Sequence, residues 1–130
     1  MYKLTIISDF AAAHNLRGYE GECENLHGHN WKVEVTVESK GLNNIGLAVD
    51  YKILKKILKE ILDNLDHKYL NDIMPFNKEN PSSENIARYI YREFEKMLLN
   101  PTVSTLQNGV VNVASVKVWE SDNAAATYYE

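Results

Sequence analysis

The sequence contains a single cysteine, Cys23, so no disulfide can form within the chain and no oxidising compartment is indicated. There is no basic tract, and the formal net charge is −4 at pH 7, which argues against a nucleic-acid partner. The apolar residues near the start are interrupted by Thr5 and Asp9, so they predict neither a signal peptide nor a membrane span. We therefore expect a cytoplasmic protein without a membrane partner.

No repeat, low-complexity segment or linker divides the 130 residues, which predicts one domain over 1–130. Alternation and helical spacing of apolar residues predict, in order, strands 2–14 and 27–38, helices 51–64 and 82–100, and strands 110–120 and 124–129. Residues 68–81 are expected to be irregular. The ββααββ order predicts an α+β fold: a four-stranded antiparallel sheet with two helices on one face. Its two edge strands favour closure by neighbouring subunits.

Three histidines are predicted on the inward faces of the first two strands. His14 has the parity of the apolar positions in its strand, and His27 and His29 have the parity of Trp31. A lone inward histidine is usually a hydrogen-bonded core residue, but three that converge predict a metal site, and imidazoles favour zinc. Three protein ligands leave one coordination position open for chemistry. Alternatively, Cys23 closes the shell and the site is structural.

Cys23 is either an ordinary loop residue or, close to a metal, a thiol whose pKa falls so that it can act as base or nucleophile. Asp66 and His67 follow the first helix. The pair either stabilises the helix end or forms a proton shuttle in which the carboxylate orients the imidazole. In the shuttle case the two residues must lie past the end of the helix.

Glu120 shares the parity of the apolar positions Val110, Ala114, Val116 and Val118. Either it turns out to water at the strand end, or it faces inward and anchors a ligand. A carboxylate that accepts two N–H groups suits a 2-amino-4-oxo-pyrimidine edge, as in a pterin. By local sequence alone, Ser83 and Glu84 are helix-capping residues and Glu24 is a solvated loop acid.

Five short motifs together resemble those of the 6-pyruvoyl-tetrahydropterin and 6-carboxytetrahydropterin synthase family. They are FAAAH at 10–14, CENLHGHN at 23–30, LDH at 65–67, NPSSEN at 80–85 and KVWE at 117–120. The motifs follow the family order and span nearly the whole chain.

The resemblance implies the tunnelling fold, in which subunit sheets join into a barrel and active sites form between the subunits of a hexamer or tetramer. It implies zinc on the three histidines and proton transfer by Cys23, Asp66 and His67. It further implies that Glu120 anchors the pterin ring, with support from Ser83 and Glu84. The implied substrate is 7,8-dihydroneopterin triphosphate.

The spacing of three residues between Cys23 and His27 is similar to the 6-carboxytetrahydropterin branch, which feeds queuosine-type deazapurine synthesis. Relatives with a glutamate at the position of Glu24 look like folate-pathway enzymes, which cut the side chain to give 6-hydroxymethyl-7,8-dihydropterin. Because this chain carries both residues, Glu24 is a second catalytic candidate. The motifs are also compatible with pyruvoyl synthase activity and with a non-catalytic domain that binds zinc and a pterin.

Overall fold

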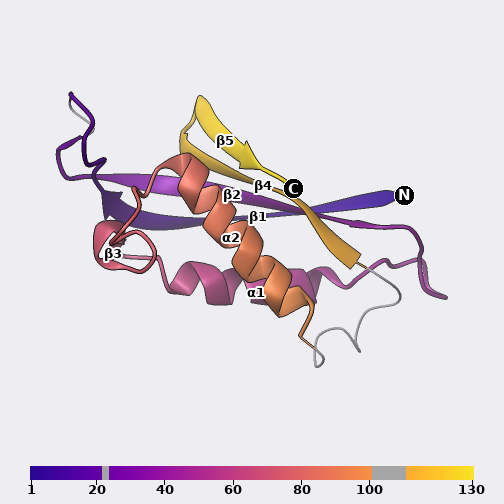
Figure 1. The fold of residues 1–130 in the computed structure, drawn as a ribbon. Coiled ribbons are helices and arrows are strands. Elements are labelled where there is room, and N and C mark those ends of the chain that lie inside the picture. The colour runs from indigo at the N-terminus through magenta and orange to yellow at the C-terminus, as the bar shows by residue number, and fades with distance from the viewer. Residues whose placement is uncertain (22–23, 101–110) are drawn as a thin grey trace.

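The computed structural model describes residues 1–21, 24–100 and 111–130. This part of the chain forms an α+β fold in which two helices cover one face of a mixed five-stranded sheet (Figure 1). The elements are β1 (Tyr2–His14), β2 (His27–Ser39), α1 (Tyr51–Asp63), β3 (Lys68–Tyr69), a 3₁₀ turn (Leu70–Asp72), α2 (Ser83–Leu98), β4 (Val111–Ser121) and β5 (Ala124–Tyr128).

The sheet has the strand order β3-β1-β2-β4-β5. β1 and β2 are antiparallel, with His14 opposite His27 and Ala12 opposite His29. β4 runs antiparallel to β2, and Trp119 lies opposite Lys32. This register brings the end of β1, the start of β2 and the end of β4 to the same part of the sheet.

The prediction of an antiparallel four-stranded sheet missed β3, which runs parallel to β1 and pairs with Ala12 and Ala13. β3 lies in the segment predicted to be irregular. Two residues are too few to show an alternating pattern, so a strand of this length leaves no periodic signal in the sequence. Its position is fixed just upstream, where the backbone amide of His67 donates to the carbonyl of Ala11 at 2.6 Å.

The predicted inward parity of Ala114 was wrong, because β4 contains a bulge. Thr36 pairs with Ser115 and Val37 pairs with Val113, so Ala114 is the additional residue. The buried side chains are therefore Val111 and Val113 before the bulge and Val116 and Val118 after it. The prediction for Val110 lies outside the described residues. Glu120 lies at a second irregularity, between Trp119 and Ser121 in the pairing of β4 with β5. Its side chain nevertheless faces inward, as predicted, and approaches His29.

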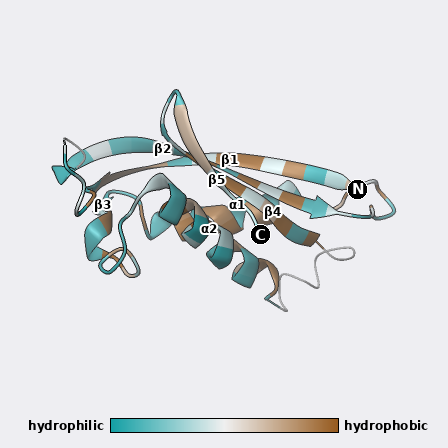
Figure 2. Cartoon of the chain, turned by 45° about the horizontal axis from the view of Figure 1, so that its top comes forward, coloured by the Kyte–Doolittle hydropathy of each residue, from teal (hydrophilic) through white to brown (hydrophobic). Residues whose placement is uncertain are grey.

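Both predicted helices are confirmed, and each begins with a side-chain cap. Asp50 accepts from the amide of Lys52 at 2.8 Å, and Ser82 accepts from the amide of Asn85 at 3.2 Å. The cap of α2 is thus Ser82, and Ser83 is the first helical residue. Figure 2 shows both helices on the same side of the sheet, where their apolar residues meet those of the strands. Across the described ranges, no helix has the length and apolar character needed to cross a membrane.

Candidate metal centre

Four side chains from three strands converge at one end of the covered face of the sheet. They are His14 at the end of β1, His27 and His29 at the start of β2, and Glu120 near the end of β4. One ligand atom from each lies within 4.8 Å of all the others. Nitrogen and carboxylate oxygen in this arrangement can hold a divalent metal ion.

The tautomers of two of these histidines are fixed by backbone carbonyls. His14 Nδ1 lies 2.7 Å from the carbonyl of Pro81, and His27 Nδ1 lies 2.7 Å from the carbonyl of Asn25. A carbonyl only accepts, so each Nδ1 carries the hydrogen and each neutral ring has its lone pair on Nε2. The two Nε2 atoms face each other at 3.0 Å. Two lone pairs at this distance repel, and a cation between them removes the conflict.

The third imidazole supplies a further unpaired nitrogen. His29 Nε2 is buried and has no hydrogen-bond partner among the described residues, although Glu120 Oε1 lies 3.1 Å away. The rings of His14 and His29 both pack edge-on against Trp31, which is fully buried. An apolar surface of this kind limits the access of water to a metal site. The residues present therefore fit a bound metal.

Burial also favours the neutral form of the imidazoles, which is the form that binds metal. Desolvation lowers the pKa of His14 below its ordinary value of 6.5, against a raising effect of the Pro81 hydrogen bond. Desolvation likewise lowers the pKa of His29, against a raising effect of the Glu120 charge. Both rings are thus expected to be available as ligands at neutral pH.

These lowered pKa values make the metal-free protein sensitive to acid. The unfolded chain takes up protons at pH 6.5 before the folded chain does, so stability falls as the pH drops from 7 through 6.5 toward 5. Melting temperatures of the chelated protein measured by circular dichroism at pH 7, 6 and 5 should show this decline. A His29→Asn variant, which lacks one of the titrating rings, should decline less. Equal slopes for the two proteins would contradict the assignment.

Glu120 faces inward, as expected of a ligand anchor, and its side chain is about a third exposed, at 31%. Its Oε1 approaches His29 Nε2 at 3.1 Å and His14 Nε2 at 3.9 Å. Ser83 Oγ lies 3.5 Å from Glu120 Oε2 and 3.4 Å from Glu84 Oε1, at the long limit of a hydrogen bond. Thus Ser83 is in position to contact both carboxylates, and Glu84 itself is exposed.

Asp66 and His67 lie past the end of α1, as a proton shuttle requires. Asp66 Oδ2 lies 2.9 Å from His67 Nδ1, and Asp66 Oδ1 accepts from the amide of Ala11 at 2.9 Å. The Ala11 amide, and then His67, lower the pKa of the Asp66 carboxyl. His67 has a φ of +57° and an 82% exposed side chain. The carboxylate therefore holds an accessible imidazole whose Nε2 faces away from its partner.

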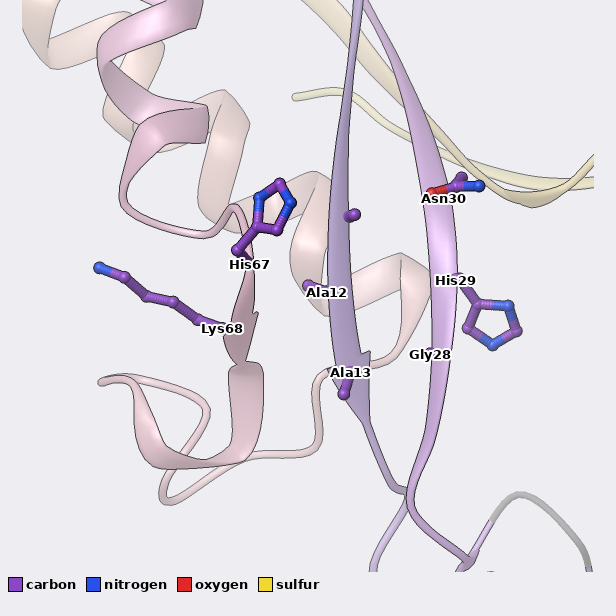
Figure 3. A pocket seen from close by; sticks show the side chains of 8 residues that line it. Ala12, Ala13, Gly28, His29, Asn30, His67 and Lys68 are labelled. Carbon is purple, nitrogen blue, oxygen red and sulfur yellow. The ribbon is translucent and has the colours of Figure 1, made fainter.

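A hollow of about 440 Å³ lies between His67 and the start of β2. Its lining residues are Ala11, Ala12, Ala13, Gly28, His29, Asn30, His67 and Lys68. Figure 3 shows His67 beside β1 and His29 on the far side of β2, with His29 pointing away from His67. Within the described chain no hydrogen bond or ion pair joins His67 to the four-residue cluster. One chain therefore presents the predicted proton shuttle and the predicted metal ligands on different sides of the sheet.

The loop that carries the two acid–base candidates before β2 is only partly described. Cys23 lies outside the described residues. Glu24 is exposed, its carbonyl accepts from the Asn15 side chain at 3.1 Å, and its amide donates to the Gly21 carbonyl at 3.2 Å. These contacts hold the loop at the end of β1, just before the Asn25 carbonyl that orients His27.

Sequence reasoning missed the contributions of Pro81, Asn25 and Trp31 to this site. The first two act through backbone carbonyls, and a carbonyl has no side-chain signature in a sequence. Trp31 carries a signal, since it shares the parity of His27 and His29 two residues further along β2. That parity predicts a core position for the indole, but it does not by itself predict contact with the imidazoles.

The fold and the cluster define an α+β protein in which three imidazoles and a carboxylate are arranged so that they could hold a metal ion. The family model for 6-pyruvoyl tetrahydropterin synthase matches residues 3–130. The chain belongs to this family, and the resemblance noted in the sequence is confirmed.

Several proteins resemble the chain over most of its length. A 6-carboxy-5,6,7,8-tetrahydropterin synthase from Synechocystis is 37% identical over 125 residues, which cover 92% of this chain and 87% of that protein. A dihydroneopterin monophosphate aldolase from Pyrococcus furiosus is 35% identical over 88% of this chain and 86% of its own length. The structure of Caenorhabditis elegans 6-pyruvoyl tetrahydropterin synthase matches 99% of this chain and 95% of its own with a TM-score of 0.83 at 26% identity.

Proposed function

We propose that the protein is a zinc-dependent lyase that converts 7,8-dihydroneopterin triphosphate and one water into 6-carboxytetrahydropterin, with release of acetaldehyde and triphosphate. The observation that carries this proposal is the convergence of three imidazole Nε2 atoms at the end of the sheet. The Synechocystis relative, named for this product, supports the choice of reaction. The product would serve queuosine-type deazapurine synthesis in the cytoplasm.

His14, His27 and His29 would hold the metal, with their Nδ1 hydrogens directed to carbonyls or solvent. When bound, Zn²⁺ supplies Lewis acidity that lowers the pKa of the side-chain hydroxyls of the substrate. The carbonyls of Pro81 and Asn25 keep two of the rings in the tautomer that presents Nε2. Trp31 limits water on the buried side of the cluster.

Proton transfer would be the role of His67, oriented by Asp66, together with the thiol of Cys23. Asp66 holds Nδ1 of His67, so Nε2 is the atom that takes or gives a proton. The lowered pKa of Asp66 keeps it a carboxylate, which stabilises the imidazolium that forms. The high exposure of His67 leaves its ring accessible to a substrate or to another subunit.

The pterin ring would be anchored by the carboxylate of Glu120, with Ser83 and Glu84 in support. The 2-amino-4-oxo edge offers two N–H donors, which a carboxylate accepts side by side. Ser83 lies close enough to orient both carboxylates. None of these three residues lines the hollow beside His67, so the ring would lie on the Glu120 side of the cluster.

Assembly into a hexamer or tetramer would complete the site. β1 has 13 residues but only Ala12 and Ala13 pair with β3, so most of its outer edge is unpaired among the described residues. β5 lies at the other edge of the sheet. Pairing of such edges between subunits would close the sheets into a barrel. It would also allow His67 of one subunit to reach the metal centre of another.

A second candidate is cleavage of the side chain to 6-hydroxymethyl-7,8-dihydropterin for folate synthesis. It is favoured by Glu24, next to Cys23 in the loop, and by the relative that is named a dihydroneopterin monophosphate aldolase. The two reactions can occur in one protein if the thiol and the carboxylate serve different proton transfers.

Product analysis on two loop variants separates these reactions. Cys23→Ala should lower formation of 6-carboxytetrahydropterin by about 100-fold, and Glu24→Ala should lower formation of the hydroxymethyl product to a similar degree. Chromatography of reactions of the zinc-loaded variants with 7,8-dihydroneopterin triphosphate measures both products. Equal loss of both products in each variant would refute the division of roles. If the fully zinc-loaded wild-type protein forms neither product, both reactions are excluded, and the remaining alternative is a non-catalytic domain that binds zinc and a pterin.

A further inference from the structure

Glu120 lies in an unusual position for a carboxylate whose only task is to bind a ring. It continues the inward face of β4 after the buried residues Val116 and Val118. Burying a carboxylate is costly unless a positive charge or hydrogen bonds compensate. Among the described residues its ion-pairing partners are His14 and His29, and no lysine or arginine reaches it. Beyond the solvent that reaches its exposed third and the Ser83 hydroxyl near Oε2, the compensation for its charge therefore comes from these rings or from something they hold.

The contact between Glu120 and His29 is close, yet it is not a hydrogen bond. Glu120 Oε1 lies 3.1 Å from His29 Nε2, while this nitrogen has no hydrogen-bond partner within the described chain. An imidazole nitrogen and a carboxylate oxygen that approach closely without the geometry of a hydrogen bond are typical of ligands around one cation. The ligand–ligand edges of a tetrahedral zinc site with 2.0–2.1 Å bonds are roughly 3.3 Å. Three of the separations within the cluster, at 3.0, 3.1 and 3.9 Å, lie around this value, and all four ligand atoms lie within 4.8 Å of one another.

We propose that Glu120 Oε1 is the fourth ligand of the metal in the resting protein. Its other oxygen, Oε2, lies 3.5 Å from the Ser83 hydroxyl at the start of α2, which helps to orient the carboxylate. If the proposed pterin chemistry holds, the same carboxylate is also the ring anchor. A bound ring then withdraws Glu120 from the metal and opens the coordination position. Substrate binding thereby exposes the metal only when the ring is in place.

The proposed coordination of the metal by Glu120 in the resting protein can be tested without any substrate. Chelated protein is reloaded with Co²⁺ to record its visible absorption, and the affinity for Zn²⁺ is measured by competition with a chromophoric chelator. Glu120→Gln should lower the Zn²⁺ affinity about 10- to 100-fold and change the Co²⁺ spectrum. The matched control is Glu84→Gln, since Glu84 also lies near Ser83 but does not contact the histidines. Glu84→Gln should leave both the Zn²⁺ affinity and the Co²⁺ spectrum unchanged. Circular dichroism of the chelated variants confirms that both are folded.

Unchanged affinity and spectrum in Glu120→Gln would overturn the proposal. The same holds if Cys23→Ser changes the spectrum and Glu120→Gln does not, because the fourth ligand would then be the thiol. These measurements involve no turnover, so they stand even if the proposed reaction is wrong.

The exchange of Glu120 between metal and ring has its own test. Unsubstituted pterin, which has no side-chain hydroxyl, is titrated into the Co²⁺ protein while its own fluorescence reports binding. The wild-type spectrum should move toward that of Glu120→Gln, and the variant spectrum should stay constant. A pterin that binds without changing the wild-type spectrum, or that changes both, would overturn the exchange. A pterin that does not bind would contradict the proposal that Glu120 anchors the ring. The proposal that Glu120 is the fourth metal ligand would be unaffected.

Discussion

A His27→Asn variant is expected to bind zinc at least about 100-fold more weakly than the wild-type protein and to lose measurable turnover. The imidazole provides one of the converging Nε2 atoms, and even groups that only orient a ligand contribute 10- to 100-fold to metal affinity. His27 is a better choice than His14 for this test, because His14 is almost completely buried and its removal would disturb the core. Metal content after gel filtration and competition with a chelator give the two readouts.

The control for this variant is a histidine outside the cluster, so His67→Asn should bind zinc as the wild-type protein does. Retention of full metal affinity by His27→Asn would exclude this residue as a ligand. Equal loss of metal from both variants would indicate a general effect on folding rather than the loss of a ligand.

His67→Asn itself is expected to lower kcat by about 10²- to 10⁴-fold at full metal occupancy, which is the usual contribution of a general acid–base group. Asparagine is the preferred replacement because His67 has a φ of +57°, and asparagine adopts this left-handed conformation more readily than most residues. The measurement is steady-state product formation with 7,8-dihydroneopterin triphosphate, alongside metal analysis. A kcat within about threefold of wild type would contradict the proton-transfer role.

The two variants together test whether the site is shared between subunits. His29 and His67 point to different sides of the sheet in one chain, so each active site would take its metal from one subunit and its shuttle from another. Mixed oligomers of His27→Asn and His67→Asn would then contain some sites with both groups intact. Partial recovery of activity is expected on co-expression. No recovery in verified mixed oligomers would contradict the shared site.

Much of the fold follows from local patterns in the sequence. The strict alternation in β2 and the helical spacing in α1 each bury one face, and the structure confirms both elements to within one residue of the predicted ends. The same parity places His14, His27 and His29 on the covered face. Their convergence could be predicted because antiparallel pairing of neighbouring strands sets His14 opposite His27.

Other features depend on contacts between distant segments and could not be predicted in this way. The strand β3 exists because the Ala11 backbone pairs with the segment after α1, and two residues show no period. The bulge at Ala114 changes parity where no glycine or proline marks it. The approach of Glu120 to His29 requires the register between β2 and β4, which the sequence alone does not provide.

Acetaldehyde release is the most direct measurement of the proposed activity. Zinc-loaded protein at one metal per chain is incubated with 7,8-dihydroneopterin triphosphate, and acetaldehyde is quantified together with substrate consumed. We predict one acetaldehyde for each substrate converted to 6-carboxytetrahydropterin, and none from the chelated protein. Intact substrate and no acetaldehyde after incubation with the fully loaded protein would contradict the assignment as a 6-carboxytetrahydropterin synthase.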